Sequence, residues 1–104
     1  MHPDTKFTDV PGETFGHEIV LYGLTRCEPC REAKQFMDSK GWGYKYVHLE
    51  RQPKELRQEI KKRFADAFGK RPVFPVIEID GDYHFGFNPD AWTQWIRGGE
   101  GANG

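Results

Sequence analysis

The feature that most constrains the fold is an apolar strand pattern that runs directly into a cysteine pair and then into a helix pattern. Residues 19–22 form an apolar run that begins with the β-branched Ile19 and Val20, which predicts a strand buried on both faces. Gly23 begins a loop that holds Cys27 and Cys30, the only cysteines of the chain. From Glu28 to Lys40 apolar residues recur at helical spacing. The chain must therefore mix strands with helices, and Cys27 should lie at a helix N-terminus.

The rest of the chain completes one α/β domain. Residues 43–49 alternate as a strand does, and residues 53–68 carry an apolar stripe at helical spacing. Residues 76–85 contain two strand patterns around Asp80-Gly81, a pair typical of a tight hairpin turn. Asn88-Pro89 predicts the start of a last helix. We expect Trp92, Trp95 and Ile96 to face inward and Gly98-Gly99 to end this helix. The order predicts a four-stranded mixed sheet, βαβ then ββα, flanked by three helices.

The length of 104 residues fits a single domain. Residues 1–17 show no sustained periodicity, and we expect an extension that is disordered or laid along the surface. The domain itself should span residues 18–97, and the glycine-rich residues 98–104 should form a flexible tail.

Charge and cysteine usage narrow the classes of function. The formal net charge is −1, which gives no electrostatic reason to expect binding to nucleic acid or anionic membranes. Charged residues occupy the place where a secretory signal would need an apolar stretch, and we expect a cytoplasmic monomer. In a reducing compartment a lone Cys-x-x-Cys pair is typical of catalysis or metal binding rather than of a structural disulfide.

The position of the cysteines suggests a division of roles. Unpaired amide groups and the macrodipole at a helix N-terminus stabilise an anion, so Cys27 is predicted to be the nucleophilic thiolate. Cys30 lies one turn further along, where it can resolve a mixed disulfide. The alternatives are a buried core pair or half of a metal site. Because the four histidines show no close pairing and no other cysteine exists, we predict no metal site.

Three motifs together carry a resemblance to a known family. They are Cys27-Glu28-Pro29-Cys30, the segment Val73-Phe74-Pro75-Val76 before the hairpin, and Gly86-Phe87-Asn88-Pro89-Asp90 after it. With the order of elements, these motifs resemble the thioredoxin superfamily, in particular the small glutaredoxin-like redoxins, from Glu18 to Arg97. The resemblance implies a thioredoxin-like fold and a thiol-disulfide oxidoreductase that uses Cys27 and Cys30.

The resemblance also implies a substrate-binding set around the cysteines. Pro75 would be the cis proline that lies against the active site, and Phe74 with Pro75 would form an edge that pairs with a substrate strand. Gly86 and Phe87 are similar to the Gly-Phe-x-Pro-Asp segment of glutaredoxin-like electron donors to ribonucleotide reductase. Phe87 replaces a glycine of glutathione-using glutaredoxins, which disfavours glutathione binding. Arg26 would supply the charge beside Cys27.

The implied partners follow from the same resemblance. We expect no bound cofactor, a disulfide-containing protein such as ribonucleotide reductase as electron acceptor, and a thioredoxin-reductase-type flavoenzyme as electron source. Glutathione is the second choice of reductant. The alternative function is a non-catalytic thioredoxin-fold adaptor or an iron-sulfur cluster-binding module.

Overall fold

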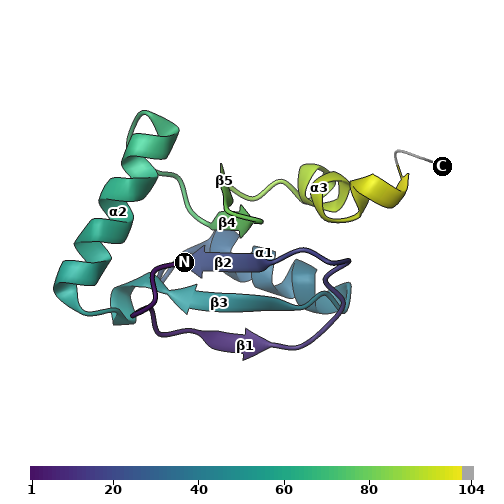
Figure 1. Ribbon diagram of the computed structural model, residues 1–104, viewed down its shortest axis with the longest axis horizontal. Coiled ribbons are helices and arrows are strands. Elements are labelled where there is room, and N and C mark those ends of the chain that lie inside the picture. The colour runs from purple at the N-terminus through teal and green to yellow at the C-terminus, as the bar shows by residue number, and fades with distance from the viewer. Residues whose placement is uncertain (102–104) are drawn as a thin grey trace.

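One mixed sheet is covered by helices on both faces (Figure 1). The computed structural model describes the backbone of residues 1–101 and the side chains of residues 1–98. The strands are β1 (Thr8–Val10), β2 (Ile19–Gly23), β3 (Tyr44–His48), β4 (Val76–Ile79) and β5 (Asp82–Phe85). The helices are α1 (Glu28–Ser39), α2 (Lys54–Phe68), α3 (Pro89–Gly101) and a 3₁₀ turn, η1 (Leu49–Arg51).

The sheet has the order β1-β3-β2-β4-β5, so β2 lies at its centre. All five residues of β2 are buried, as the apolar run predicts. β2 pairs in parallel with β3 and antiparallel with β4. The parallel pair needs a long crossover connection, and α1 provides it. The C-terminal ends of β2 and β3 therefore meet at one end of the sheet, where the cysteine loop follows β2.

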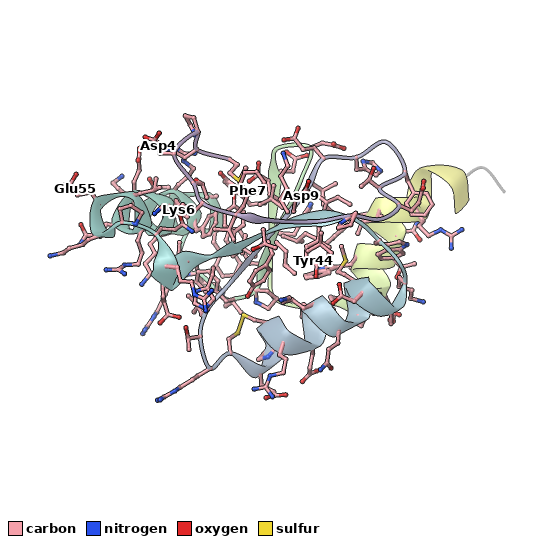
Figure 2. All side chains as sticks on the ribbon, turned by 90° about the horizontal axis from the view of Figure 1, so that it is seen from below. Asp4, Lys6, Phe7, Asp9, Tyr44 and Glu55 are labelled. Atoms are coloured by element: carbon pink, nitrogen blue, oxygen red, sulfur yellow. A yellow bond between two sulfur atoms is a disulfide. The ribbon has the colours of Figure 1, made fainter. Side chains whose placement is uncertain are left out.

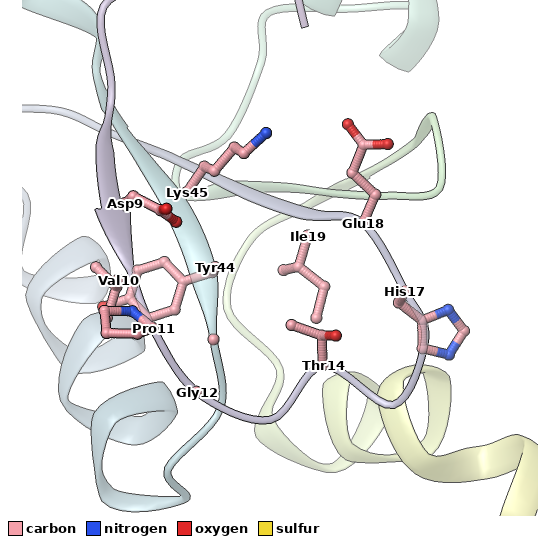
Figure 3. Close-up of a pocket in the computed structure, with 11 residues that line it drawn as sticks. Asp9, Val10, Pro11, Gly12, Thr14, His17, Glu18, Ile19, Tyr44 and Lys45 are labelled. Carbon is pink, nitrogen blue, oxygen red and sulfur yellow. The ribbon is translucent and has the colours of Figure 1, made fainter.

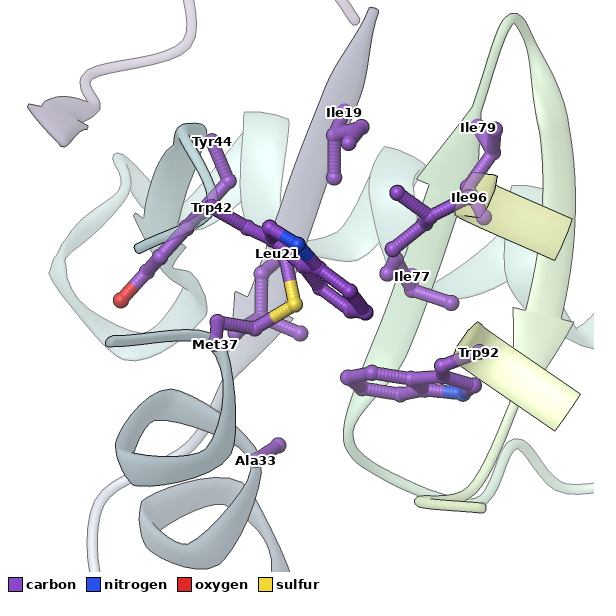
Figure 4. Close-up of a cluster of buried hydrophobic side chains, with 10 residues drawn as sticks. All are labelled: Ile19, Leu21, Ala33, Met37, Trp42, Tyr44, Ile77, Ile79, Trp92 and Ile96. Atoms are coloured by element: carbon purple, nitrogen blue, oxygen red, sulfur yellow. The ribbon is translucent and has the colours of Figure 1, made fainter. Parts of the chain in front are cut away.

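Each face of the sheet has its own apolar core. Ile19 and Leu21 of β2 face α1 and α3, where they pack with Met37, Trp92 and other buried side chains (Figure 4). Val20 and Tyr22 face the opposite way, toward α2. The α2 stripe of Leu56, Ile60 and Phe64 closes that side. A single β2 strand thus joins two layers of helices, which confirms the thioredoxin-like fold that the motifs imply.

The hairpin turn also follows the sequence prediction. Asp80 and Gly81 have φ angles of 53° and 91°, as the two central residues of a type I′ turn require. Among the described residues, no helix is long and apolar enough to cross a bilayer.

The prediction of four strands is wrong, because β1 adds a fifth. Residues 8–10 pair antiparallel with β3 and cover its outer edge. The strand is short and largely exposed, so its sequence shows no apolar alternation from which a strand could be predicted. Its pairing depends instead on the free edge of β3. The side chain of Gln52 holds the segment as well, since it accepts the N–H of Lys6 at 2.9 Å and donates to the Lys6 carbonyl at 2.8 Å. The extension is laid along the surface.

Two predictions for the last helix are also wrong. α3 continues through Gly98-Gly99 to Gly101, because glycine lowers helix propensity by only about 1 kcal/mol and does not by itself end a helix. Trp92 and Ile96 are buried as predicted, but Trp95 is 40% exposed. Its ring stacks on His84 with centroids 3.9 Å apart. The flexible tail was predicted for residues 98–104; residues 98–101 belong to α3, and residues 102–104 lie outside the described part of the chain.

Candidate active site

The two cysteines lie where the sequence places them, at the start of α1. Cys27 is the N-cap residue with an extended backbone, and its Sγ accepts the backbone N–H of Cys30 at 3.2 Å. The two residues form a disulfide. The side chain of Cys27 is half-buried, whereas Cys30 is only 2% exposed. An incoming molecule therefore reaches the sulfur of Cys27 first.

The loop before Cys27 positions it through an unusual backbone turn. Arg26 has a φ angle of 56°, in the left-handed region that non-glycine residues seldom occupy. Its side chain is exposed to solvent. In the first turn of α1, Arg31 forms an ion pair with Glu28 at 3.3 Å. Both side chains are well exposed, so this pair offsets the negative charge of Glu28 near the thiols without adding much stability.

His48, the last residue of β3, and Glu50 of η1 hold the cysteine loop, and sequence reasoning did not single them out. The carboxylate of Glu50 accepts the backbone N–H of Thr25, and this hydrogen bond lowers the pKa of Glu50. His48 Nε2 forms a hydrogen bond with the Thr25 hydroxyl at 3.1 Å. The predicted βαβ unit brings the C-terminal ends of its two parallel strands to one end of the sheet, but which residues bind the loop there depends on the strand register.

The cis-proline segment lies at the same end of the sheet. Tyr22 pairs with Val76 in the β2–β4 register, so Pro75 lies level with the start of the cysteine loop. The Phe74–Pro75 peptide bond is cis, as the resemblance implies. Gly86 donates its backbone N–H to the Pro75 carbonyl at 2.8 Å. The structure thus places the cysteine loop, the Phe74–Pro75 segment and Gly86 at one end of the sheet. The roles of these residues toward a substrate stay predictions.

The ring of Phe87 packs inward rather than standing free. Its centroid lies 5.0 Å from that of Trp92 and 5.6 Å from that of Phe36, and the side chain is half-buried against the α1–α3 core. The sequence left open whether Phe87 packs in the core or forms an exposed docking surface, and these contacts show core packing.

A cavity of about 470 Å³ lies beside the cysteine loop on the α2 side. Leu24 and Phe74 form part of its apolar lining, and Lys61, Lys62 and Arg71 add positive charge. Its volume is in the range of ligand pockets. Leu24 belongs to the cysteine loop and lines this cavity together with Phe74. A substrate segment placed in the cavity would therefore lie close to both the loop and Phe74.

A further cavity, of about 280 Å³, lies away from the cysteine loop (Figure 3). Thr14, His17 and Ile19 line it near the start of β2, together with Tyr44 at the start of β3. It is at the opposite end of both strands from the cysteine loop and takes no part in the site. Within the described residues, no group of three or more His, Cys, Asp or Glu side chains could hold a metal ion.

The N-cap position predicts an acidic thiol in the reduced protein. Because the Cys27 sulfur lies at the amide groups of the first turn of α1, we expect its pKa to fall below the value of about 8.5 for free cysteine. Ultraviolet absorbance of the thiolate, followed against pH in the C30S variant, would report Cys27 alone. The rate of alkylation should rise through the same midpoint. A midpoint at or above that of free cysteine would contradict this expectation.

Comparison with known proteins gives a consistent result. Residues 19–84 match the family model described as Glutaredoxin. A glutaredoxin-like protein of the rubredoxin operon in Clostridium pasteurianum is 31% identical over 70 residues, which cover 67% of this chain and 85% of that protein.

Solved structures show the same fold. A glutaredoxin from Methanosarcina mazei superposes with a TM-score of 0.75 at 21% identity, covering 88% of this chain and 87% of that one. The glutaredoxin-like NrdH-redoxin from Escherichia coli, whose activity profile is described as thioredoxin-like, superposes with a TM-score of 0.58 at 25% identity. That match covers 74% of this chain and 92% of the redoxin.

Proposed function

Because the chain belongs to the glutaredoxin family, we propose that it is a dithiol electron carrier that reduces disulfides in other proteins through Cys27 and Cys30. The observation that carries the proposal is the arrangement of the two sulfurs: an accessible Cys27 at the N-cap of α1 and a buried Cys30 in the first turn. Such an arrangement suits one attacking thiolate and one resolving thiol.

The proposed reaction has two exchange steps. The Cys27 thiolate attacks one sulfur of the substrate disulfide, that S–S bond breaks, and the other substrate sulfur leaves as a thiolate that takes up a proton. Cys30 then loses its proton and attacks the Cys27 sulfur of the mixed disulfide. The second substrate thiol is released, and the Cys27–Cys30 disulfide forms. Two electrons pass from the carrier to the substrate, and a reductant must return them.

The residues around the two thiols support the proposal that the substrate is a protein. Phe74 lies directly before Pro75, and with Leu24 it lines the apolar part of the α2-side cavity. A substrate strand that pairs with the backbone of Phe74 would place its disulfide over Cys27. The segment Gly86-Phe87-Asn88-Pro89-Asp90 and the likeness to the NrdH-redoxin favour ribonucleotide reductase as one such acceptor. Arg26 is proposed to guide the substrate as an exposed charge beside Cys27.

We assign the electron supply to a thioredoxin-reductase-type flavoenzyme. Phe87 supports this choice, because the resemblance implies a glycine at this position in glutaredoxins that use glutathione. Glutathione is the reductant to compare with the flavoenzyme. Lys61, Lys62 and Arg71 line the α2-side cavity and could attract the carboxylates of glutathione.

The two reductants can be compared in one assay. With insulin as the disulfide substrate, we expect faster NADPH oxidation with thioredoxin reductase than with glutathione and glutathione reductase. The Cys27→Ser variant serves as the inactive control. Turnover with glutathione alone would overturn the assignment of the reductant. Turnover with neither would favour an adaptor or a cluster-binding module. The cytoplasmic location expected from the sequence stays a prediction.

A further inference from the structure

A third cavity, of about 430 Å³, lies on the α1 side of the sheet, at the end of β3 where His48 contacts the cysteine loop. Three parts of the chain build it: the N-terminal segment with Lys6 and Phe7, Lys34 of α1, and the stretch from Tyr46 through His48 to Arg51. Figure 2 shows Lys6 and Phe7 on the N-terminal segment that runs alongside β3. The laid-down extension therefore forms one wall of this cavity, which we call the α1-side pocket.

The α1-side pocket is strongly positive in a chain whose formal net charge is −1. Lys6, Lys34 and Arg51 line it, and the lining residues, all in the described part of the chain, include no Asp or Glu. Lys34 is held in place, because its Nζ lies 4.4 Å from the ring centroid of Tyr46. Glu50, which neighbours Arg51, binds the N–H of Thr25 in the cysteine loop. None of the ion pairs between described residues involves Lys6, Lys34 or Arg51, so these cations are available to an external anion.

The pocket is connected to the thiols by a short path. His48 pairs with Gly23 in the parallel β2–β3 register, so the pocket lies at the same end of the sheet as the cysteine loop. His48 also binds the hydroxyl of Thr25, two residues before Cys27. A single molecule could therefore present its disulfide to Cys27 and place a neighbouring segment in the pocket.

From this geometry we infer that the α1-side pocket docks an acidic segment of the protein whose disulfide Cys27 attacks; the inference rests on the proposed function. A compact anion such as phosphate is usually held by converging backbone N–H groups. Here the positive charges lie on long side chains from separate segments, and Lys6 and Arg51 are exposed. This spread suits a row of carboxylates. Phe7, 45% exposed, adds an apolar contact at the rim.

Binding can be tested without any thiol chemistry. The oxidised protein should bind a fluorescein-labelled peptide of six glutamates, and the K34Q/R51Q variant should bind it about fivefold more weakly. The K40Q/K54Q variant is the matched control. It removes the same charge, and Lys40, the C-cap residue of α1, lies over the ring of Phe36 as Lys34 lies over the ring of Tyr46. Equal weakening in both variants would show unspecific attraction and overturn the inference.

Two further measurements test whether the binding is electrostatic and whether the pocket is a site for small anions. Binding should weaken as sodium chloride is raised from 50 to 300 mM, since exposed charges are screened. At equal ionic strength, inorganic phosphate should compete no better than chloride. Strong competition by phosphate would identify a small-anion site and would overturn the docking of a segment.

Exchange kinetics then connect the pocket to the reaction. The wild type should reduce a disulfide peptide followed by five glutamates with a kcat/KM about fivefold above that for the glutamine version, and K34Q/R51Q should lose this preference. Equal rates for both peptides in the wild type would overturn the inference while leaving the proposed function intact. If neither peptide is reduced, the proposed function fails, and the binding measurements alone decide the docking site.

Discussion

Replacing Cys27 with serine should abolish disulfide reduction, with turnover no higher than the uncatalysed exchange. Serine cannot act in thiol-disulfide exchange, so the first bond to the substrate would not form. The change should leave the fold intact, because serine is a preferred N-cap residue and its Oγ can accept the Cys30 N–H that the Cys27 sulfur now accepts. The insulin assay measures the activity, and thermal unfolding checks that the fold is retained.

The matched variant is Cys30→Ser, which should stop the reaction one step later. Cys27 would still attack, but nothing would resolve the product, so a mixed disulfide should accumulate and appear by mass spectrometry. The buried position of Cys30 is the physical reason for this asymmetry, since an external disulfide reaches Cys27 first. If the Cys30 variant lost the first step while the Cys27 variant formed mixed disulfides, the two roles would have to be exchanged.

The largest loss of stability is expected from Phe64→Ala in α2. Phe64 is fully buried, and its ring lies within 6.1 Å, centroid to centroid, of the rings of Tyr22, Phe74, Tyr83 and Phe85. Truncation would remove these contacts and leave a cavity, which typically lowers the free energy of unfolding by about 3–5 kcal/mol. That is a large share of the ~5–15 kcal/mol available to a domain. Denaturant unfolding of the oxidised protein would measure it.

Phe68→Ala provides the control on the same helix. Phe68 is half-buried and stacks on Phe85, with ring centroids 4.6 Å apart. Its removal should lower the free energy of unfolding by about 1 kcal/mol, typical of a partly exposed site. A loss at position 64 no greater than that at position 68 would show that the α2 core can collapse around the missing ring. Because Phe64 supports Phe74, its loss should also reduce activity below the melting temperature.

The sequence predicted those parts of the fold in which local patterns and packing agree. Residues 19–22 formed the central strand, because an apolar run of that length is stable only when both faces are covered. Asp80-Gly81 formed the hairpin turn, because this pair tolerates two positive φ angles. Asn88 caps α3, where its Oδ1 accepts the N–H of Ala91 at 3.1 Å.

What the sequence could not predict depends on contacts between distant residues. Glu78 lies in the buried strand β4, where its carboxylate accepts a hydrogen bond from the Tyr22 hydroxyl at 2.6 Å. No local sequence pattern predicts this pair. β1 was missed because its pairing is decided by the edge of β3. For the candidate site, the cysteines and the cis proline were found from motifs, whereas the bond from Thr25 to Glu50 required the register of β2 and β3.

β1 has a consequence for how the molecule behaves in concentrated solution. Its three residues are largely exposed, so β1 is expected to detach at smaller cost than the strands of the core, although Gln52 holds Lys6 and Glu13 forms backbone hydrogen bonds with Gly41 and Gly43. When it does, β3 presents an open row of backbone donors and acceptors, flanked by Tyr44 and Tyr46, that a neighbouring copy could extend. By covering the outer edge of β3, the N-terminal segment keeps this edge from pairing with another copy.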